Sequence, residues 1–450
     1  MSNSPYRALP GVDTLLELPP LNALSMGHPV QVEAAREAID AARAAIGRGE
    51  AAPDTDTIAR DAASRAKAMV DPSLRAVLNA TGVIVHTNLG RAPLSQDALQ
   101  VAAGACNLEY DLEAGSRGSR RAHVEERLRT MSGAEAALVV NNNAAAVFLA
   151  LCGIATGREV VISRGELVEI GGSFRVPDIM AASGAILREV GTTNRTYDRD
   201  FAAAIHEGTA AILSVHRSNF RIEGFTTTPS CAELAAVARA HDIPLISDLG
   251  SGSFAALPDT LQSHGDPRRE LADGADIVCF SGDKILGGPQ AGILLGRADL
   301  IGRLAKHPLA RALRVGKLTL AALDHTLMAY RAGRPDEIPV WAMMHASMDD
   351  LSARAGALAQ DLSDVPAELE VVACHDTIGG GSHPGELLDG VALAIRPHAS
   401  SADALCTRLR KGETPLITVI TGDRVLVHVR TLTPRDDGRA GELLRAALGP

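Results

Sequence analysis

Two residues with complementary chemistry, Asp248 and Lys284, each follow a short apolar run and lie thirty-six residues apart. That separation accommodates one strand, one helix and a second strand, so the two side chains can meet at one edge of a parallel sheet. A lysine amine can form a Schiff base and a carboxylate can keep a pyridinium nitrogen protonated, which together suit pyridoxal phosphate. A strand-end cap and a solvated loop charge are common alternatives, so both interpretations stay open for the isolated residues.

Polar residues after other apolar runs suggest how the phosphate of such a cofactor would be held. In VVNNNAAAVFLAL, residues 139–151, a strand-like run is followed by Asn142 and Asn143, which open a helical pattern. Backbone N–H groups at such a helix start can bind a phosphate, to which the Ser281 hydroxyl can add a hydrogen bond. His216, at the end of AAILSVH, can stack on a cofactor ring or take part in proton transfer. A helix cap, a turn serine and a structural histidine are the alternatives.

A basic segment without acidic residues, 301–320, indicates a second anion site. Arg311 and Arg314 lie three residues apart, so they share one face of a helix and can grip a phosphate-like oxyanion. Arg91, after the glycine turn in HTNLGRAPL, is a candidate third member, and a solvated basic face is the alternative. A separate basic loop, which can contact a nucleic-acid backbone, a neighbouring subunit or solvent, contains Arg117, Arg120 and Arg121.

The elements that would position these residues alternate between short β-rich runs and helical patterns. The runs AALVV, REVVIS, GAILREV, AAILSV, IPLISD and ADIVCFS are each followed by a loop or a helix-like segment. This alternation is typical of a parallel sheet flanked by helices, in which ligands bind at the carboxyl edge of the strands. We expect Asn141 to Asn143, His216, Asp248 and Lys284 at that edge.

Changes of pattern along the chain predict three domains of an α/β protein. Alanine-rich helical patterns, broken at GRGEAAPDT, predict a small helical domain over residues 1–66. The alternating segment predicts a catalytic core over residues 67–335. Beyond RAGRPDEIP, strand-like LEVVA, GVALAI and RVLVHVRTL and helical SADALCTRLR predict a smaller α/β domain over residues 336–450.

Composition narrows the classes of protein. The chain has 450 residues, 46% of them apolar, and a formal net charge of −10, which argues against indiscriminate binding to nucleic acid but allows a local basic patch. Its six cysteines are scattered without metal-ligand spacing, so we expect neither a metal site nor a disulfide framework. The sequence shows neither a signal peptide nor a long apolar run, so we expect a cytoplasmic protein without a membrane partner.

Several long motifs, in order along the chain, closely resemble those of one protein family. They are NATGVIVHTNLGRAPLS, NLEYDLEAGSRGSR, VNNNAAAV, SRGELVEIGGSFRVPDIM, GTTNRTY, SDLGSGS, FSGDKILGGPQAGI and HPLARALR. The family is bacterial selenocysteine synthase, the L-seryl-tRNA(Sec) selenium transferases, and the similarity runs from about Val77 to Leu323. The helical N-terminus and the α/β C-terminus also match the arrangement of this family.

The resemblance implies a fold-type-I pyridoxal phosphate enzyme in which Lys284 forms the Schiff base. It implies that Asp248 faces the pyridine nitrogen, and that Asn142, Asn143 and Ser281 lie around the phosphate. The positions expected to bind a selenophosphate-type donor are Arg91, Arg311 and Arg314. The resemblance also implies that the N-terminal helices recognise the tRNA. The implied assembly is a homo-oligomer, a decamer built as a ring of five dimers with active sites at dimer interfaces.

The implied reaction converts L-seryl-tRNA(Sec) to L-selenocysteinyl-tRNA(Sec) with selenophosphate as the selenium donor. The seryl amino group would replace Lys284 in the pyridoxal phosphate aldimine, and the freed lysine would remove the α-proton. Loss of the β-hydroxyl would leave an aminoacrylyl-tRNA, to which selenium adds. Asp283, beside the lysine, is a candidate proton carrier for the departing hydroxyl, and a turn residue is the alternative interpretation.

Two other classes of protein remain open at this point. The first is a related pyridoxal phosphate lyase that acts on a small amino-sugar acid and would not need a tRNA-recognition domain. The second is a non-enzymatic RNA-binding or scaffold protein built on the same fold, against which Lys284 and Asp248 argue. The N-terminal helices and the three donor-site arginines favour the transferase over the lyase.

Overall fold

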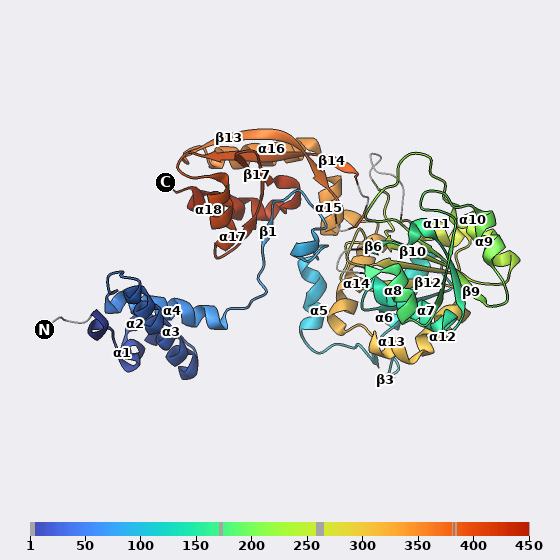
Figure 1. The fold of residues 1–450 in the computed structure, drawn as a ribbon, viewed down its shortest axis with the longest axis horizontal. Helices are drawn as coiled ribbons and strands as arrows, with labels where there is room; N and C mark the ends of the chain where they lie inside the picture. Colours follow the sequence, from blue (N-terminus) through green and yellow to red (C-terminus); the bar gives the residue numbers. More distant parts are fainter. Residues whose placement is uncertain (1–4, 171–173, 258–264, 380, 383–384, 450) are drawn as a thin grey trace. The chain divides into compact units, whose positions relative to one another are not determined.

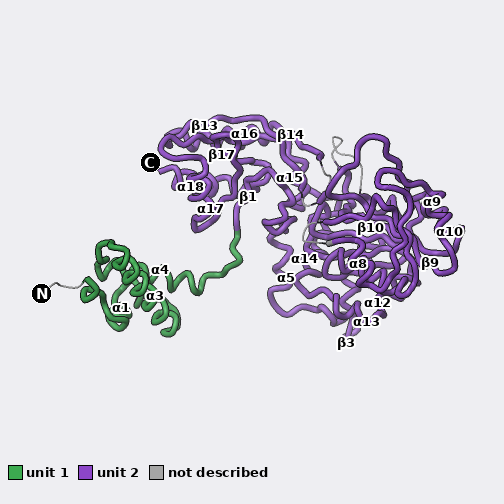
Figure 2. Tube along the Cα trace, viewed as in Figure 1, with its two compact units in different colours: residues 1–76 green, residues 77–450 purple. Residues whose placement is uncertain are grey.

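The chain forms two compact units, Met1–Ala76 and Val77–Pro450 (Figure 2). The computed structural model describes residues 5–170, 174–257, 265–379, 381–382 and 385–449. Each unit has a hydrophobic core of its own, so each is described by itself. None of the helices in the described ranges is both long enough and apolar enough to cross a membrane.

Unit 1 is a small helical bundle whose core consists largely of alanine. Its elements are η1 (Pro5–Ala8), α1 (Val12–Glu17), α2 (Pro19–Asn22), α3 (His28–Gly47) and α4 (Thr55–Val70). The buried alanines, which let α3 and α4 approach closely, are Ala34, Ala35, Ala38, Ala42, Ala59, Ala62 and Ala66. Asp54 caps α4 by accepting a hydrogen bond from Thr57 N–H at 2.6 Å. The predicted boundary at residue 66 falls inside α4, whereas the units divide after Ala76.

A seven-stranded sheet forms the core of the larger part of unit 2 (Figure 1). In sheet order its strands are β4 (Ala136–Val140), β12 (Gly292–Gly296), β11 (Ile277–Ser281), β10 (Leu245–Ser251), β9 (Thr209–Val215), β5 (Glu159–Ser163) and β8 (Ile186–Val190). The pairs from β11 to β8 are all parallel, while β12 runs antiparallel to both β11 and β4. The prediction of a mostly parallel sheet is therefore confirmed.

Helices cover both faces of this sheet, as the alternation in the sequence predicts. One face packs against α6 (Ala122–Ser132), α9 (Asp198–Ala204), α10 (Cys231–Ala240) and α14 (Lys317–Arg331). The other packs against α7 (Asn143–Ala155), α8 (Val176–Ala182) and α12 (Ala298–Lys306). Within β5, Val161 points into the first core and Val160 and Ile162 into the second, the alternation that a sheet buried on both faces requires.

Unit 2 also contains several short elements. They are α5 (Gln100–Ala103), α11 (Pro267–Asp273), α13 (Pro308–Ala312), β2 (Tyr110–Asp111), β3 (Ser116–Arg117), β6 (Glu169–Ile170) and β7 (Phe174–Arg175). Single 3₁₀ turns span Thr87–Leu89, Gln96–Leu99, Arg164–Glu166, Pro335–Glu337, Val429–Thr431 and Pro434–Asp436.

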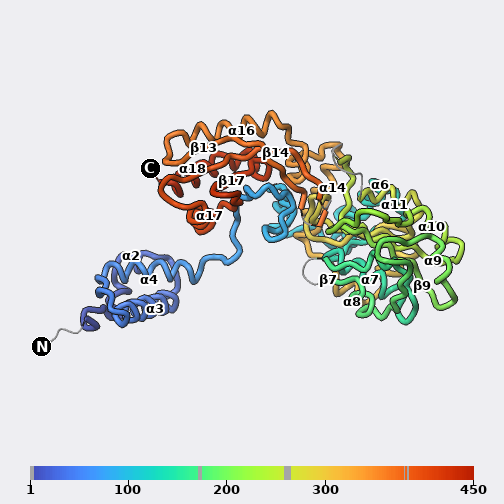
Figure 3. The backbone as a smooth tube through the Cα atoms, turned by 45° about the horizontal axis from the view of Figure 1, so that its top comes forward, coloured from blue at the N-terminus to red at the C-terminus, as the bar shows by residue number. Residues whose placement is uncertain are grey.

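The C-terminal part of unit 2 is a smaller α/β layer with its own core. Its antiparallel sheet has the order β13 (Ala367–Thr377), β14 (Leu387–Pro397), β17 (Arg424–His428) and β16 (Val419–Thr421). The helices of this region are α15 (Pro339–His345), α16 (Met348–Asp361), α17 (Ala402–Lys411) and α18 (Asp437–Leu448). An earlier segment joins it, because β1 (Leu78–Asn79) pairs with β15 (Leu416–Ile417), and this segment runs beside the C-terminal layer (Figure 3). The division at residues 335 and 336 stays a prediction.

A buried ionic network ties the C-terminal strands together. Asp376 of β13 is 0% exposed; its Oδ1 lies 2.6 Å from His428 Nδ1 and its Oδ2 accepts a hydrogen bond from Arg430 Nε at 2.8 Å. Arg430 also donates to the Met343 carbonyl in α15 at 2.7 Å. Cys374, Asp376 and His428 bring three potential metal ligands within 4.8 Å of one another. Both Asp376 oxygens are already engaged, so we interpret the cluster as structural.

Replacing Asp376 by alanine should destabilise this region strongly, because it leaves the Arg430 guanidinium buried without its carboxylate. We expect the unfolding free energy to fall by about 3–5 kcal/mol. Urea denaturation followed by fluorescence measures this change locally, since the single tryptophan of the chain, Trp341, is buried in α15.

The matched control for that experiment is Glu370→Ala, which breaks the exposed ion pair between Glu370 and Arg424 in the same sheet. We expect it to cost about 0–1 kcal/mol. Equal losses of stability in the two variants would contradict the assignment of the Asp376 network as a structural tie.

Candidate active site

The centre of the candidate site is a buried aspartate–lysine pair at the ends of two neighbouring strands. Asp248 lies in β10 opposite Cys279 of β11, and Lys284 follows Ser281, the last residue of β11. Asp248 is 3% exposed and Lys284 is 6% exposed. The parallel pairing of β10 with β11 brings both groups to the same edge of the sheet, although they are distant in sequence.

Burial shifts both groups toward their neutral forms. It lowers the pKa of the Lys284 amine, and the Asp248 carboxylate opposes that shift. Burial also raises the pKa of Asp248, against which the hydrogen bonds from Asn143 and from Gly250 N–H and the charge of Lys284 act. The lysine therefore loses its proton more readily than an exposed lysine, as a nucleophile or base requires, while fixed donors favour the charged form of the aspartate.

The segment after β4 contributes two asparagines with different contacts. Asn142 caps α7, because its side-chain oxygen accepts a hydrogen bond from Ala145 N–H at 2.8 Å. Asn143 Nδ2 donates to Asp248 Oδ1 at 2.7 Å, so its amide is held against the aspartate. Gly292 of β12 leaves space for this turn, since a Cβ there would collide with the Asn142 carbonyl. The start of α7 thus lies beside Asp248 and presents backbone N–H groups to an anion.

Asp283, next to Lys284, sits in a network of its own. Its carboxylate accepts hydrogen bonds from Arg91 Nη1 at 3.1 and 3.2 Å and from Ser281 Oγ at 2.5 Å. A backbone hydrogen bond links the same two segments, because Ala92 N–H donates to the Asp283 carbonyl at 3.2 Å. The structure thus places Arg91 and Ser281 beside Asp283, and the predicted contact of Ser281 with a phosphate stays a prediction.

Two buried polar atoms at this site lack a hydrogen-bond partner in the protein. Among the described residues, the buried side-chain atoms without a partner are Arg121 Nε, Asn143 Oδ1 and Ser218 Oγ. A Cβ on Gly250 would lie 3.4 Å from Ser218 Oγ and 3.8 Å from Lys284 Nζ, so the hydroxyl and the amine face the same space. Gly250 has φ +65°, a conformation that favours glycine, and its missing side chain keeps that space open.

These groups fit pyridoxal phosphate. Lys284 offers an amine for its aldehyde, Asp248 a carboxylate for its ring nitrogen, and the start of α7 backbone donors for its phosphate. Buried polar atoms are rarely left without a partner, so Ser218 Oγ and Asn143 Oδ1 offer hydrogen bonds that a polar ligand or a buried water would complete.

The end of β9, which leads to His216, is held by a buried carboxylate that sequence reasoning missed. His216 N–H donates to the Asp248 carbonyl at 2.8 Å, which places the histidine beside the aspartate as expected. Glu166, after β5, accepts a hydrogen bond from Val215 N–H at 3.1 Å, and burial raises its pKa to about 7. Nothing in the pattern of SRGELVEIGG marks this glutamate as buried. Residues 171–173 of the longer motif SRGELVEIGGSFRVPDIM lie outside the described part of the chain.

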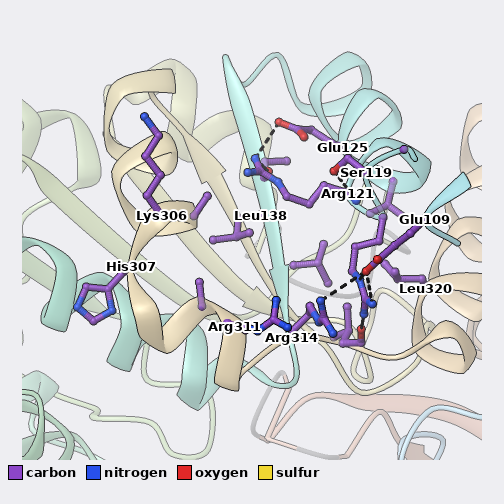
Figure 4. A pocket seen from close by; sticks show the side chains of 18 of the residues that line it. Glu109, Ser119, Arg121, Glu125, Leu138, Lys306, His307, Arg311, Arg314 and Leu320 are labelled. Carbon is purple, nitrogen blue, oxygen red and sulfur yellow. Dashed lines mark hydrogen bonds and ion pairs between the residues drawn. The ribbon is translucent and has the colours of Figure 1, made fainter. Parts of the chain in front are cut away.

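Arg311 and Arg314 line a cavity of about 510 Å³ (Figure 4). The basic side chains around it are Arg117, Arg120, Arg121, Lys306, Arg311 and Arg314. Glu109 neutralises part of this charge by pairing with Arg120 at 2.6 Å and with Arg314 at 3.4 Å. The structure therefore brings together two of the three predicted donor-site arginines, whereas Arg91 pairs with Asp283.

Replacing Glu166 by glutamine should change how stability depends on pH. The folded pKa of about 7 lies above the ordinary 4.5, so the Glu166 proton favours the folded state below pH 4.5 and this contribution is lost as pH rises through 7. Glutamine lacks this proton but can still accept the Val215 hydrogen bond. Relative to the wild type, Glu166→Gln should therefore gain roughly 1–3 kcal/mol of unfolding free energy between about pH 5 and pH 8.

Urea denaturation at several pH values measures that gain, with the exposed Glu126→Gln as a control in which no trend is expected. A difference between Glu166→Gln and the wild type that does not change with pH would contradict the buried, titrating carboxyl.

Two family models and several curated relatives match this chain. The family model "L-seryl-tRNA selenium transferase" matches residues 77–433, and "Selenocysteine synthase N terminal" matches residues 6–43. An L-seryl-tRNA(Sec) selenium transferase from Moorella thermoacetica is 47% identical, over 99% of this chain and 97% of the relative. The enzyme of the same name from Geobacter metallireducens is 45% identical, over 96% of each chain.

A solved structure shares the fold. D-glucosaminate-6-phosphate ammonia-lyase superposes with a TM-score of 0.57 at 23% identity, over 83% of this chain and 96% of that chain. With the architecture described above, this likeness confirms the predicted fold class. The fold alone does not identify the family. The family model over residues 77–433 and the relatives that match nearly the whole length show that the chain belongs to the L-seryl-tRNA selenium transferase family.

Proposed function

We propose that this protein is a pyridoxal 5′-phosphate-dependent L-seryl-tRNA(Sec) selenium transferase, which converts L-seryl-tRNA(Sec) to L-selenocysteinyl-tRNA(Sec) with selenophosphate. The observation that carries the proposal is the buried pair of Asp248 and Lys284 in a chain that matches this family along its length. Residues 6–43 match the family's own N-terminal model, which favours the transferase over a lyase for a small amino-sugar acid.

Lys284 and Asp248 are the residues proposed to hold the cofactor. Pyridoxal phosphate, when bound, withdraws electrons from the carbon that carries the substrate amino group, so that this carbon gives up its proton more easily. Lys284 would bind the cofactor covalently through Nζ, and Asp248 would accept a hydrogen bond from its charged ring nitrogen. The helix start that Asn142 caps would bind the phosphate, and His216 lies next to Asp248, where it can pack against the ring.

Proton transfer falls to Lys284 and its neighbour Asp283. Because burial lowers the pKa of Lys284, more of the amine is unprotonated near neutral pH and can accept the α-proton of the seryl group. Arg91 and Ser281 donate hydrogen bonds to Asp283 and so fix its carboxylate beside the lysine. We therefore propose that Asp283 transfers a proton to the departing β-hydroxyl.

Arg311 and Arg314 are proposed to bind the phosphate part of selenophosphate. Their guanidinium groups line one cavity, and Arg311 forms none of the ion pairs in the part of the chain that the structure describes. Arg91, the third proposed member, instead lies at Asp283. Because the family resemblance implies active sites at dimer interfaces, we propose a homo-oligomer in which these two arginines of one subunit contribute to the site that contains Lys284 of another. Resemblance to the family suggests a decamer of five dimers.

Unit 1 is proposed to recognise the tRNA. Its helical bundle folds around its own core, as a separate recognition module requires. The net charge of −10 does not oppose this role, because tRNA can be recognised by its shape through a local surface rather than by bulk charge. Since aminoacyl-tRNA is made in the cytoplasm, we propose that the protein acts there.

Product analysis tests the proposed reaction. The purified protein with seryl-tRNA(Sec), selenophosphate and pyridoxal 5′-phosphate should convert serine on the tRNA to selenocysteine, which mass spectrometry identifies after deacylation. Lys284→Ala should lower kcat by at least about 10³-fold, because it removes both the covalent anchor and the base. The exposed Lys411→Ala should keep the wild-type rate. Serine that stays unchanged with all components present would rule out the transferase.

Subunit complementation tests the proposed shared site. Lys284→Ala and the double variant Arg311→Ala/Arg314→Ala should each be inactive alone. If the arginines serve a neighbouring Lys284, co-expressed chains should recover roughly a quarter of the wild-type activity, because random pairing restores one site in each mixed dimer. Hybrids without recovered activity would place the lysine and both arginines in the same subunit.

A further inference from the structure

One hydrogen bond links the start of α7 to the middle of the sheet. Asn143 Nδ2 donates to Asp248 Oδ1 at 2.7 Å, across 105 residues of sequence. Sequence reasoning placed Asn143 with the phosphate, but in the structure its amide contacts the aspartate. The neighbouring Asn142 already caps the helix, so the Asn143 side chain is not needed for that purpose.

The chemistry of the two groups fixes the orientation of this amide. A carboxylate only accepts hydrogen bonds, so the NH₂ side of Asn143 must face Asp248, and the reverse orientation would set two acceptors against each other. The amide oxygen then points to buried space, where it has no partner in the protein. Asn143 keeps its hydrogen bond to Asp248 although its amide oxygen has no partner in the protein. We interpret this hydrogen bond as part of the site.

The geometry at Asp248 shows what the contact does. Asn143 and Gly250 N–H both donate to the same oxygen, Oδ1, at 2.7 and 2.9 Å. Two donors from different elements fix the plane of the carboxyl group, and neither of them uses Oδ2. Oδ2 therefore stays available to accept a hydrogen bond from a ligand.

We propose that Asn143 is a positioning residue that orients Asp248 and keeps it charged, so that the aspartate can hold the cofactor ring nitrogen in its protonated form. This inference rests on the proposed function, because it assigns the target of Asp248. Electrostatics support it: burial raises the pKa of Asp248, and the Asn143 hydrogen bond is the largest influence in the opposite direction, ahead of Gly250 and Lys284.

The test is the protonation state of the ring nitrogen, read directly by ¹⁵N NMR of the full-length protein loaded with ring-¹⁵N-labelled pyridoxal 5′-phosphate. Asn143→Ala and Asn143→Leu both remove the donor but differ in volume, so an effect that they share belongs to the hydrogen bond. The matched control is Asn141→Ala, an exposed asparagine two residues away.

The wild type and Asn141→Ala should give the ¹⁵N shift of a protonated pyridine, and both Asn143 variants should move toward the unprotonated shift. Their kcat should fall by about tenfold or more with KM for seryl-tRNA(Sec) changed less than about threefold, as expected when a transition-state interaction is lost. A protonated shift in both Asn143 variants would overturn the proposal. Loss of the fold in both would also overturn it, because Asn143 would then be required for folding.

Failure of this inference is distinguishable from failure of the proposed function. If the wild type makes selenocysteinyl-tRNA(Sec) and the Asn143 variants keep the protonated nitrogen, only the role of Asn143 is wrong. If the wild type binds the cofactor with a protonated nitrogen that depends on Asn143 but leaves serine unchanged, the inference stands and the substrate assignment fails.

Discussion

The candidate site depends on an aspartate and a lysine that are buried together where β10 and β11 end. Burying two ionisable groups costs free energy. Taking charged groups out of water favours their neutral forms, and the pKa values of Asp248 and Lys284 are displaced in that direction. Fixed donors limit the effect, because Gly250 N–H and the Asn143 amide both reach the aspartate. The elements that carry these donors, β10 and α7, pack into the hydrophobic cores on the two faces of the sheet.

The surrounding parts of unit 2 serve the same strand ends. Glu166 holds the last N–H of β9, which fixes the start of the loop that carries Ser218. The C-terminal region also reaches the site, since Ser382 Oγ donates to Ser251 Oγ at 2.9 Å and a Cβ on Gly381 would lie 3.7 Å from Lys284 Nζ. This contact adds to the hydrophobic core that residues of both parts share, such as Ile285 and Ile378.

The mostly parallel sheet and the meeting of Asp248 with Lys284 could be predicted from the sequence. The contacts that could not be predicted all depend on the order of the strands. Alternating runs predict a parallel sheet, and the rule that ligands bind at strand ends brings Asp248 and Lys284 together. Sequence does not reveal which strands are neighbours: β4 pairs with β12, and β1 pairs with β15 near the other end of the chain. The Asn143 contact depends on that order, as does the burial of Glu166. Side-chain contacts between distant segments therefore had to come from the structure.

The position of the covalent attachment shows whether the buried lysine beside Asp248 binds the cofactor. Borohydride reduction of the protein loaded with pyridoxal 5′-phosphate, followed by digestion and tandem mass spectrometry, identifies the modified lysine. We expect the added mass on Lys284, the buried amine beside Asp248. Modification of a different lysine, or an unmodified Lys284 after complete loading and reduction, would contradict it.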